Sequence, residues 1–148
     1  MSVNKRKAGD YLKILFLGHI VGRPGRKTVQ SFLPKMKEDQ KIDMVIANGE
    51  NIAGGFGITP ALMYELFSAG IDVFTSGNHI WNKKEIFDVI STEERLLRPA
   101  NYPPGVPGRG TGTYQFGNFR VAVINLLGRV FISSPCDCPF LTALREVE

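Results

Sequence analysis

The sequence is poor in the residues on which several classes of protein depend. It contains only two cysteines, two histidines and one tryptophan among 148 residues. Cys136 and Cys138 are separated by a single residue, so a disulfide between them is not expected, and two cysteines alone do not make a zinc site. We therefore expect free thiols, which excludes a disulfide-stapled scaffold and a structural zinc module.

Long hydrophobic runs are also absent. No apolar segment approaches the roughly 20 residues that a membrane-spanning helix requires, and no apolar segment of a secretory leader follows the basic N-terminal residues. We therefore expect a cytoplasmic protein with no membrane partner. Residues 1–11 are predicted to form a basic flexible tail, and residues 12–148 are predicted to form one domain.

Positive charge is in modest excess, with a formal net charge of +4. This balance suits an anionic ligand but does not identify one. The sequence has no basic strand rich in aromatic residues, so specific nucleic-acid binding is not expected.

Strand-like and helix-like segments alternate along the chain, which is typical of an α/β fold with a mostly parallel sheet and flanking helices. Residues 12–18 form a continuous apolar run of the kind that is buried on both faces of a parallel sheet. Residues 42–48 and 71–77 predict two further strands. Turn residues Gly117 and Asn118 separate two alternating segments and predict a hairpin.

Helices are predicted between the strands. Residues 26–37 carry an apolar stripe, which indicates an amphipathic helix, and Pro34 is expected to kink or divide it. The stripe consists of Val29, Phe32, Leu33 and Met36.

Four more segments complete the predicted organisation. Thr59 and Pro60 are a favourable helix start, and that helix is predicted to end at Gly70. A further helix is predicted over residues 83–90, and a last one begins near residues 137–139. Residues 96–112, rich in proline and glycine, predict an irregular loop.

Polar side chains beside glycine follow each of the three predicted strands. In open α/β sheets, ligands bind beyond the carboxyl ends of the strands. Glycine in such positions allows sharp turns and the close approach of a ligand. We therefore expect five side chains to lie along one edge of the sheet: His19, Glu50, Asn51, Asn78 and His79.

The motif GHIVGRPGRKT does not match either common nucleotide-binding loop. A Walker loop requires glycine at the position of Ile20, and Gly18, Gly22 and Gly25 have the wrong spacing for a dinucleotide fingerprint. Two roles stay open for this segment. The N-terminus of the following helix can contact phosphate through its free N–H groups, and nearby arginines are either phosphate contacts or solvated.

A dinuclear phosphoesterase site fits the strand-end residues better. Glu50 is the only carboxylate among them, so it is the candidate bridging ligand. Asn51 and Asn78 can coordinate metal through their amide oxygens. His79 follows a candidate ligand directly, and it suits contact with, or protonation of, a leaving oxygen.

Three motifs carry a close resemblance to a known family. They are GHIVGRPGRKTV, DMVIANGENIAGGFGIT and GIDVFTSGNHIWNKKEI. Together they resemble the YmdB-like family of calcineurin-type metallophosphoesterases over residues 12–139. The resemblance implies the N-terminal half of an αββα sandwich, a truncated metallophosphoesterase domain whose second sheet is incomplete.

The resemblance also implies chemistry. It suggests a phosphodiesterase that acts on 2′,3′-cyclic nucleotides with two divalent ions, iron or manganese, or else zinc. Carried over by position, Glu50 bridges the metals, and Asn51 and Asn78 are ligands. His79 is the catalytic acid or a phosphate contact. Gly54 and Gly55 lie in the predicted substrate-binding loop.

Two departures from the family pattern limit these expectations. His19 stands where the family has aspartate, so a metal ligand at this position would be neutral instead of anionic. The family's later metal-binding histidines have no counterpart in this sequence. We therefore expect at most one weakly bound ion, and weak activity or none in this chain alone.

Alternatives to a self-sufficient enzyme stay open. The chain is either a remnant of the catalytic fold or a non-catalytic protein that binds an anion or a metal for regulation. A homo-oligomer or a complementing C-terminal fragment are the macromolecular partners considered. Trp81 and Phe56 are interpreted as packing or pocket-wall residues, not as platforms for a nucleobase.

Overall fold

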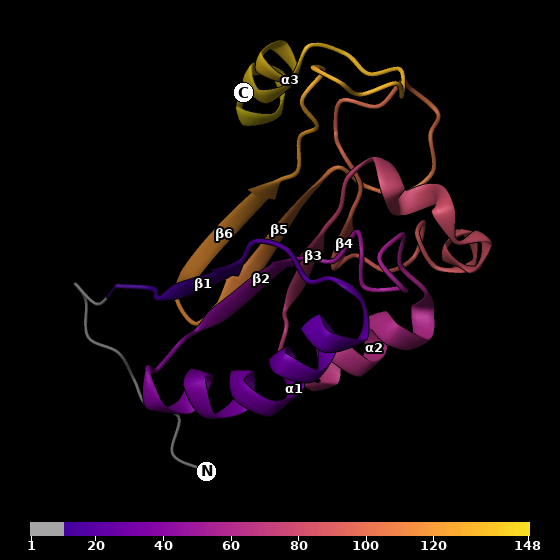
Figure 1. Ribbon diagram of the computed structural model, residues 1–148. Helices are drawn as coiled ribbons and strands as arrows, with labels where there is room; N and C mark the ends of the chain where they lie inside the picture. Colours follow the sequence, from indigo (N-terminus) through magenta and orange to yellow (C-terminus); the bar gives the residue numbers. More distant parts are fainter. Residues whose placement is uncertain (1–10) are drawn as a thin grey trace.

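The computed structural model describes residues 11–148 and has two sheets (Figure 1). The predicted tail, residues 1–11, lies outside the described residues except for Tyr11. The elements, in chain order, are β1 (Ile14–Leu17), α1 (Gly22–Asp39), β2 (Met44–Asn48), α2 (Pro60–Ser68), β3 (Val73–Thr75), the 3₁₀ helices η1 (Asn78–Asn82) and η2 (Lys84–Asp88), β4 (Leu96–Leu97), β5 (Thr111–Phe116), β6 (Phe119–Ile124) and α3 (Pro139–Val147).

The larger sheet is parallel and has the order β1-β2-β3-β4, while β5 and β6 form an antiparallel pair. The predicted α/β class, with a mostly parallel sheet and flanking helices, is therefore confirmed, and the second sheet is the β5–β6 pair. Alternate residues of β2 and β3 face opposite sides. Val45, Ala47 and Phe74 pack with α1 and α2, whereas Met44 and Val73 pack with the β5–β6 hairpin.

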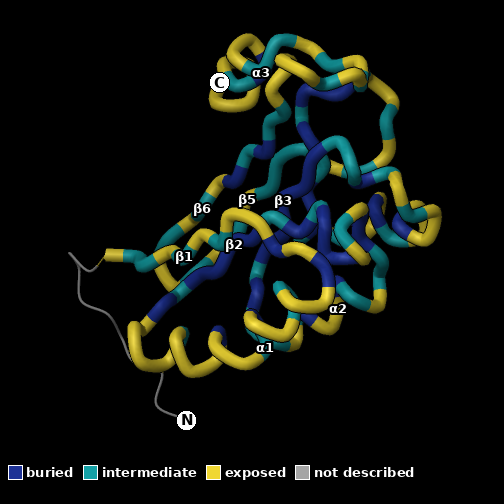
Figure 2. The backbone as a smooth tube through the Cα atoms, in the orientation of Figure 1, coloured by how far each residue is buried: buried dark blue, intermediate teal, exposed yellow. Residues whose placement is uncertain are grey.

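This two-sided packing makes β2 and β3 the centre of the molecule. Both strands are buried along their length in Figure 2, apart from the last residue of β2. The helices cover one face of the sheet and the hairpin lies against the other. Each buried apolar side chain contributes roughly 1.5–3 kcal/mol of transfer free energy, so these two layers hold the strand ends in place.

The first helix differs from its prediction. α1 begins at Gly22, four residues before the expected start, and continues without interruption through Pro34. A break at Pro34 was therefore a wrong prediction. Pro34 lies on the exposed side of the helix, where the ring has room. Only part of the predicted stripe is buried: Val29 and Leu33 face the core, whereas Phe32 and Met36 are exposed.

The predicted helix over residues 83–90 is also wrong. The segment contains only the short 3₁₀ helix η2, which Lys83, in an extended conformation, separates from η1. The main chain turns through i to i+3 hydrogen bonds, such as Ile86 N–H to the Lys83 carbonyl oxygen at 3.2 Å. These tighter turns place Ile80 and Ile86 in the core, and that burial overrides the helical pattern of the sequence.

Residues 96–112 were predicted as an irregular loop, but their first two residues form β4 and their last two begin β5. β4 exists because Leu96 and Leu97 pair in parallel with Phe74 and Thr75. Two residues show no periodicity of their own, so no sequence pattern could identify this strand. Residues 98–110 contain no helix or strand.

The other predicted elements are confirmed. α2 begins at Pro60 after Thr59 and ends before Gly70, which has a φ of +111° that favours glycine. The antiparallel pair β5–β6 turns at Gly117 and Asn118. In the described part of the chain, no helix combines the length and apolarity needed to cross a membrane.

β1 is less buried than its sequence suggests. It is the edge strand, and its pairing with β2 places Ile14 beside Met44 and Phe16 beside Ile46, on the hairpin side of the sheet. The core cluster that includes the hairpin contains no residue of β1, and Ile14 is 43% exposed and Phe16 is 58% exposed. The expectation that both faces of this strand are buried was wrong.

A buried asparagine joins the ends of three strands. The Asn125 side-chain amide donates hydrogen bonds of 2.9 Å to the carbonyl oxygens of Ser76 and Leu97. Its backbone N–H donates to the Gly110 carbonyl oxygen at 3.0 Å. Asn125 therefore links the segment after β6 to the carboxyl ends of β3 and β4, near the predicted site.

We predict that Asn125→Ala lowers the free energy of unfolding by about 1–3 kcal/mol, because the Ser76 carbonyl oxygen loses this donor and the Leu97 carbonyl oxygen keeps only the hydrogen bond from Ser76 Oγ. Urea denaturation of the purified chain measures this change. Asn82→Ala is the matched control, since Asn82 is exposed, and its effect should stay within about 0.5 kcal/mol. Equal midpoints for the two variants would show that the Asn125 hydrogen bonds are not structural.

Candidate functional site

The predicted site residues occupy three adjacent strand ends. His19 follows β1, Glu50 and Asn51 follow β2, and Asn78 and His79 begin η1 after β3. Parallel-type contacts continue past the strands, because Ile20 N–H donates to the Asn48 carbonyl oxygen and Val21 bridges to Asn51. This extension draws the polar segments together.

Asn51 is the centre of the cluster. Its amide group lies 2.7 Å from His79 Nδ1 and 2.5 Å from His19 Nε2. The amide nitrogen faces the carbonyl oxygens of Gly55, at 2.8 Å, and Glu50, at 3.2 Å. Carbonyl oxygens only accept, so these two fix the amide orientation. Nδ2 then donates to His79 Nδ1, and Oδ1 accepts from His19 Nε2.

The orientation of Asn51 determines both histidine tautomers. His79 Nδ1 accepts, so its ring proton is on Nε2, on the side away from Asn51. His19 donates from Nε2. Three residues of the predicted set, His19, Asn51 and His79, are thus joined in one chain of hydrogen bonds, although no sequence pattern indicates that they bind one another.

The glycine-rich loop is attached to the same amide. Gly54 and Gly55 have φ values of +69° and +96°, which favour glycine. A Cβ added to either would meet no heavy atom within 4 Å, so the space beside this backbone is open. Gly57 instead packs tightly against η1. This loop is therefore fixed at Gly57 and accessible at Gly54 and Gly55.

The Glu50 carboxylate lies against the main chain of Gly77. A Cβ at Gly77 would overlap Glu50 Oε2. This oxygen is buried and has no hydrogen-bond partner among the described residues. A buried carboxylate oxygen without a donor is costly, and a cation is the partner that such an oxygen favours. Asn78, the next residue after Gly77, is partly exposed at the same strand end.

Two neighbouring residues were missed by the sequence patterns. Gly77 leaves the space that the Glu50 carboxylate fills. Burial raises the pKa of Tyr102, and the charge of Glu50 contributes to that shift. Tyr102 comes from the segment between β4 and β5, in a proline-rich stretch with no motif, so only the fold could place it here.

The arginines of the opening motif have different roles. Arg26 Nη1 donates to the Ile52 carbonyl oxygen at 2.5 Å, which attaches α1 to the segment after β2. Arg23 is exposed. Arg26 is therefore a structural residue in this arrangement, and Arg23 is the solvent-facing cation of the pair.

The donor set is short of anionic ligands. Among residues 11–148, no group of three or more histidine, cysteine, aspartate or glutamate side chains could hold a metal ion. The ligands that the sequence predicts are two amides, one histidine and one carboxylate. One of the amides, Asn51, is engaged with both histidines.

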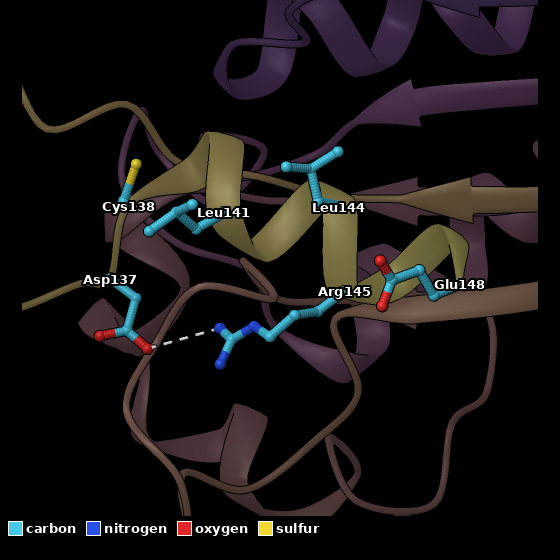
Figure 3. A pocket seen from close by; sticks show the side chains of 6 residues that line it. All are labelled: Asp137, Cys138, Leu141, Leu144, Arg145 and Glu148. Atoms are coloured by element: carbon cyan, nitrogen blue, oxygen red, sulfur yellow. Dashed lines mark ion pairs between the residues drawn. The ribbon is translucent and has the colours of Figure 1, made fainter.

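A separate hollow of about 490 Å³ lies beside α3. Figure 3 shows its lining from α3 and the preceding turn, with Asp137 paired to Arg145 at 3.7 Å. None of the predicted site residues lines it: the lining consists of Asp137, Cys138, Leu141, Leu144, Arg145 and Glu148. Both cysteines are free thiols, as predicted.

The fold and the strand-end motifs both match those of known proteins. Residues 15–148 match the family model described as YmdB-like protein. The chain belongs to the YmdB-like family. The match covers all the strand-end motifs, so the family resemblance of the sequence is confirmed.

The YmdB-like chain has curated relatives. It is 47% identical over 132 residues to the 2′,3′-cyclic-nucleotide 2′-phosphodiesterase of Bacillus subtilis, a match that covers 89% of this chain and 50% of the relative. It is 32% identical to a putative phosphatase/phosphodiesterase of Mycoplasma genitalium, over 80% of this chain and 44% of that protein. The YmdB-like chain thus spans about half the length of the curated relatives it matches.

Solved structures agree with this fold. A hypothetical protein from Thermus thermophilus superposes on the YmdB-like chain with a TM-score of 0.85 and 36% identity, covering 90% of this chain and 52% of that one. A phosphatase from Mycoplasma pneumoniae gives a TM-score of 0.84 at 30% identity, covering 92% and 50% respectively.

We predict that both histidines of the YmdB-like chain, when neutral, carry their ring proton on Nε2. With only two histidines in the sequence, a long-range ¹H–¹⁵N spectrum resolves each ring. Asn51→Ala removes the shared partner, so both rings should shift toward a mixture of tautomers. An Nδ1–H tautomer for His79 in the unmodified chain would contradict the arrangement.

Proposed function

We propose that the strand-end residues act in the metal-dependent hydrolysis of a phosphodiester, with a 2′,3′-cyclic nucleotide as substrate. The observation that carries the proposal is the buried Glu50 Oε2, which has no hydrogen-bond partner among residues 11–148; Glu50 directly precedes Asn51, which is hydrogen-bonded to His79. The name of the Bacillus subtilis relative supports the substrate class. The chain spans half of that relative. The activity of the full-length relative is therefore proposed for this chain.

One cation fits the residues present. Glu50 Oε2 would hold a divalent ion, with the amide oxygen of Asn78 as a second ligand, since hard divalent cations prefer oxygen donors. Iron, manganese and zinc stay the candidate metals. When bound, the ion would polarise a phosphoryl oxygen and stabilise the charge that develops on it. We propose one weakly bound ion, because a second ion would require further anionic ligands.

The tautomer of His79 favours one of its two expected roles. Asn51 Nδ2 donates to His79 Nδ1, so Nε2–H is left to donate a hydrogen bond to a phosphoryl oxygen. Protonation of a leaving oxygen requires a doubly protonated ring, whose Nδ1–H would face the Asn51 amide nitrogen. His79 is therefore proposed as a phosphate contact.

Gly54 and Gly55 supply the other side of the proposed phosphate position. Their backbone is open to solvent on the side where a Cβ would stand. Gly22, the first residue of α1, adjoins the same loop, since a Cβ added to it would lie 3.8 Å from the Gly55 nitrogen. Phosphate at this position would lie close to the positive end of the α1 helix dipole, which favours an anion.

A second candidate function is the non-catalytic binding of an anion or a metal. The hydrogen bond between His19 and Asn51 favours it, because Asn51 Oδ1 accepts a hydrogen bond from His19 Nε2 and is not free to coordinate an ion. His19 and Asn51 remain predicted ligands that this arrangement does not present to a metal. A homo-oligomer, a complementing C-terminal fragment and a cytoplasmic location also remain predictions.

We predict that the purified chain hydrolyses 2′,3′-cyclic AMP slowly with manganese or iron, well below the median of about 10 turnovers per second for enzymes. Asn78→Ala and His79→Ala should abolish this activity, whereas Lys35→Ala, on the exposed side of α1, should leave it unchanged. Binding of the cyclic nucleotide without any turnover would favour the non-catalytic function.

We predict that Glu50→Gln abolishes the binding of Mn²⁺ in isothermal titration calorimetry, because the amide removes the negative charge. His19→Asp should tighten binding by about tenfold or more, since affinity for a hard cation rises with the number of anionic ligands. Glu38→Gln, on the exposed surface of α1, is the matched control. Unchanged binding in Glu50→Gln would contradict the proposed metal position.

A further inference from the structure

An exposed aromatic ring lies at the edge of the proposed site. Phe56 is 57% exposed, although it stands between the fully buried side chains of Ile52 and Ile58. Trp81 is different, because it is partly buried, stacks on Phe87 and packs against the main core, as the sequence suggested. Packing therefore accounts for Trp81 and not for Phe56.

The ring is held next to His79. The centroids of the Phe56 and His79 rings are 5.1 Å apart in an edge-to-face arrangement with an interplanar angle of 65°. Phe56 is thus in contact with the residue proposed to bind phosphate. In a nucleotide a single sugar separates the phosphate from the base. A site that binds a nucleotide therefore needs a position for the base next to its position for the phosphate.

The main chain holds this position firmly. Asn51 Nδ2 donates to the Gly55 carbonyl oxygen, and Ala53 N–H donates to the Gly57 carbonyl oxygen at 3.0 Å. Gly57 has a φ of +81°, and a Cβ there would lie 2.9 Å from Lys83 Cγ and 3.2 Å from the His79 carbonyl oxygen. The residues on both sides of Phe56 are therefore tied to the segment that carries His79.

A large apolar ring that is exposed but fixed in place is suited to a flat ligand. Aromatic side chains bind nucleobases by stacking, and every base offers a π-face for it. The open space at Gly54 and Gly55 leaves room beside the ring. No charged side chain is needed for such a contact, so it would add selectivity for nucleosides to the phosphate binding of His79.

We propose that Phe56 is a specificity-determining residue that stacks on the nucleobase of the substrate. The inference rests on the proposed function, because it takes the phosphate position from His79. It adds to that function the residue by which the site would select phosphodiesters that carry a base over those that do not.

The test compares two ligands that differ by the base, adenosine 5′-monophosphate and ribose 5-phosphate. Both are titrated into the full chain in a Zn²⁺ buffer, and the amide signals of Gly54 and Gly55 are followed by NMR. The unmodified chain should bind the nucleotide roughly 5- to 150-fold more tightly than the sugar phosphate, the range expected for one stacked base.

Variants separate stacking from other roles. Phe56→Ala should reduce the ratio of the two affinities to about one while the affinity for ribose 5-phosphate stays the same, and Phe56→Trp should restore the preference. Phe32→Ala removes another exposed phenylalanine, on α1, and should change nothing. Because Phe56 is exposed, its replacement should leave the fold intact, which the same spectra verify.

Each other outcome has a definite meaning. Equal affinity of the unmodified chain for both ligands would overturn the stacking role while leaving the phosphate site in place. An equal loss of both affinities in Phe56→Ala would also overturn it, because the residue would then only shape the loop. Failure of the unmodified chain to bind either ligand would overturn the inference, and failure to bind 2′,3′-cyclic AMP as well would overturn the proposed function itself.

Discussion

The arrangement of the site depends on the side-chain amide of Asn51. One planar group contacts His19, His79 and the Gly55 carbonyl oxygen, and these come from the segments after β1, β3 and β2. An amide can do this because it combines two donors with an acceptor in fixed positions. A carboxylate of the same shape only accepts when ionised, so it could not donate to the Gly55 oxygen and to His79 Nδ1.

The sequence was informative where residue type alone determines the outcome. Three strands with polar residues at their ends predicted the parallel sheet and the edge where the cluster lies, because parallel strands place their carboxyl ends together. It was uninformative where tertiary pairing decides. β4 exists only because Leu96 and Leu97 pair with β3. η1 and η2 are 3₁₀ helices because this tighter turn places both Ile80 and Ile86 in the core.

The candidate site shows the same division. His19, Glu50, Asn51, Asn78 and His79 were identifiable by their positions after glycine-rich strand ends. The hydrogen bonds among them were not, because residue type does not specify which of several polar groups will pair. The role of Gly77 also could not be read from the sequence. The space that a side chain at Gly77 would fill is occupied by the Glu50 carboxylate, which comes from the segment after β2. Phe56 was interpreted as a packing or pocket-wall residue, since burial cannot be read from a loop without periodicity.

The exposed edge of β1 has a consequence for handling the protein. The outer main-chain groups of an edge strand can accept another strand, and Ile14 and Phe16 add an uncovered apolar strip on the adjoining face. At the high concentrations used for spectroscopy, the protein will therefore tend to associate through the edge of β1. A polypeptide segment that covers this apolar strip will reduce that association.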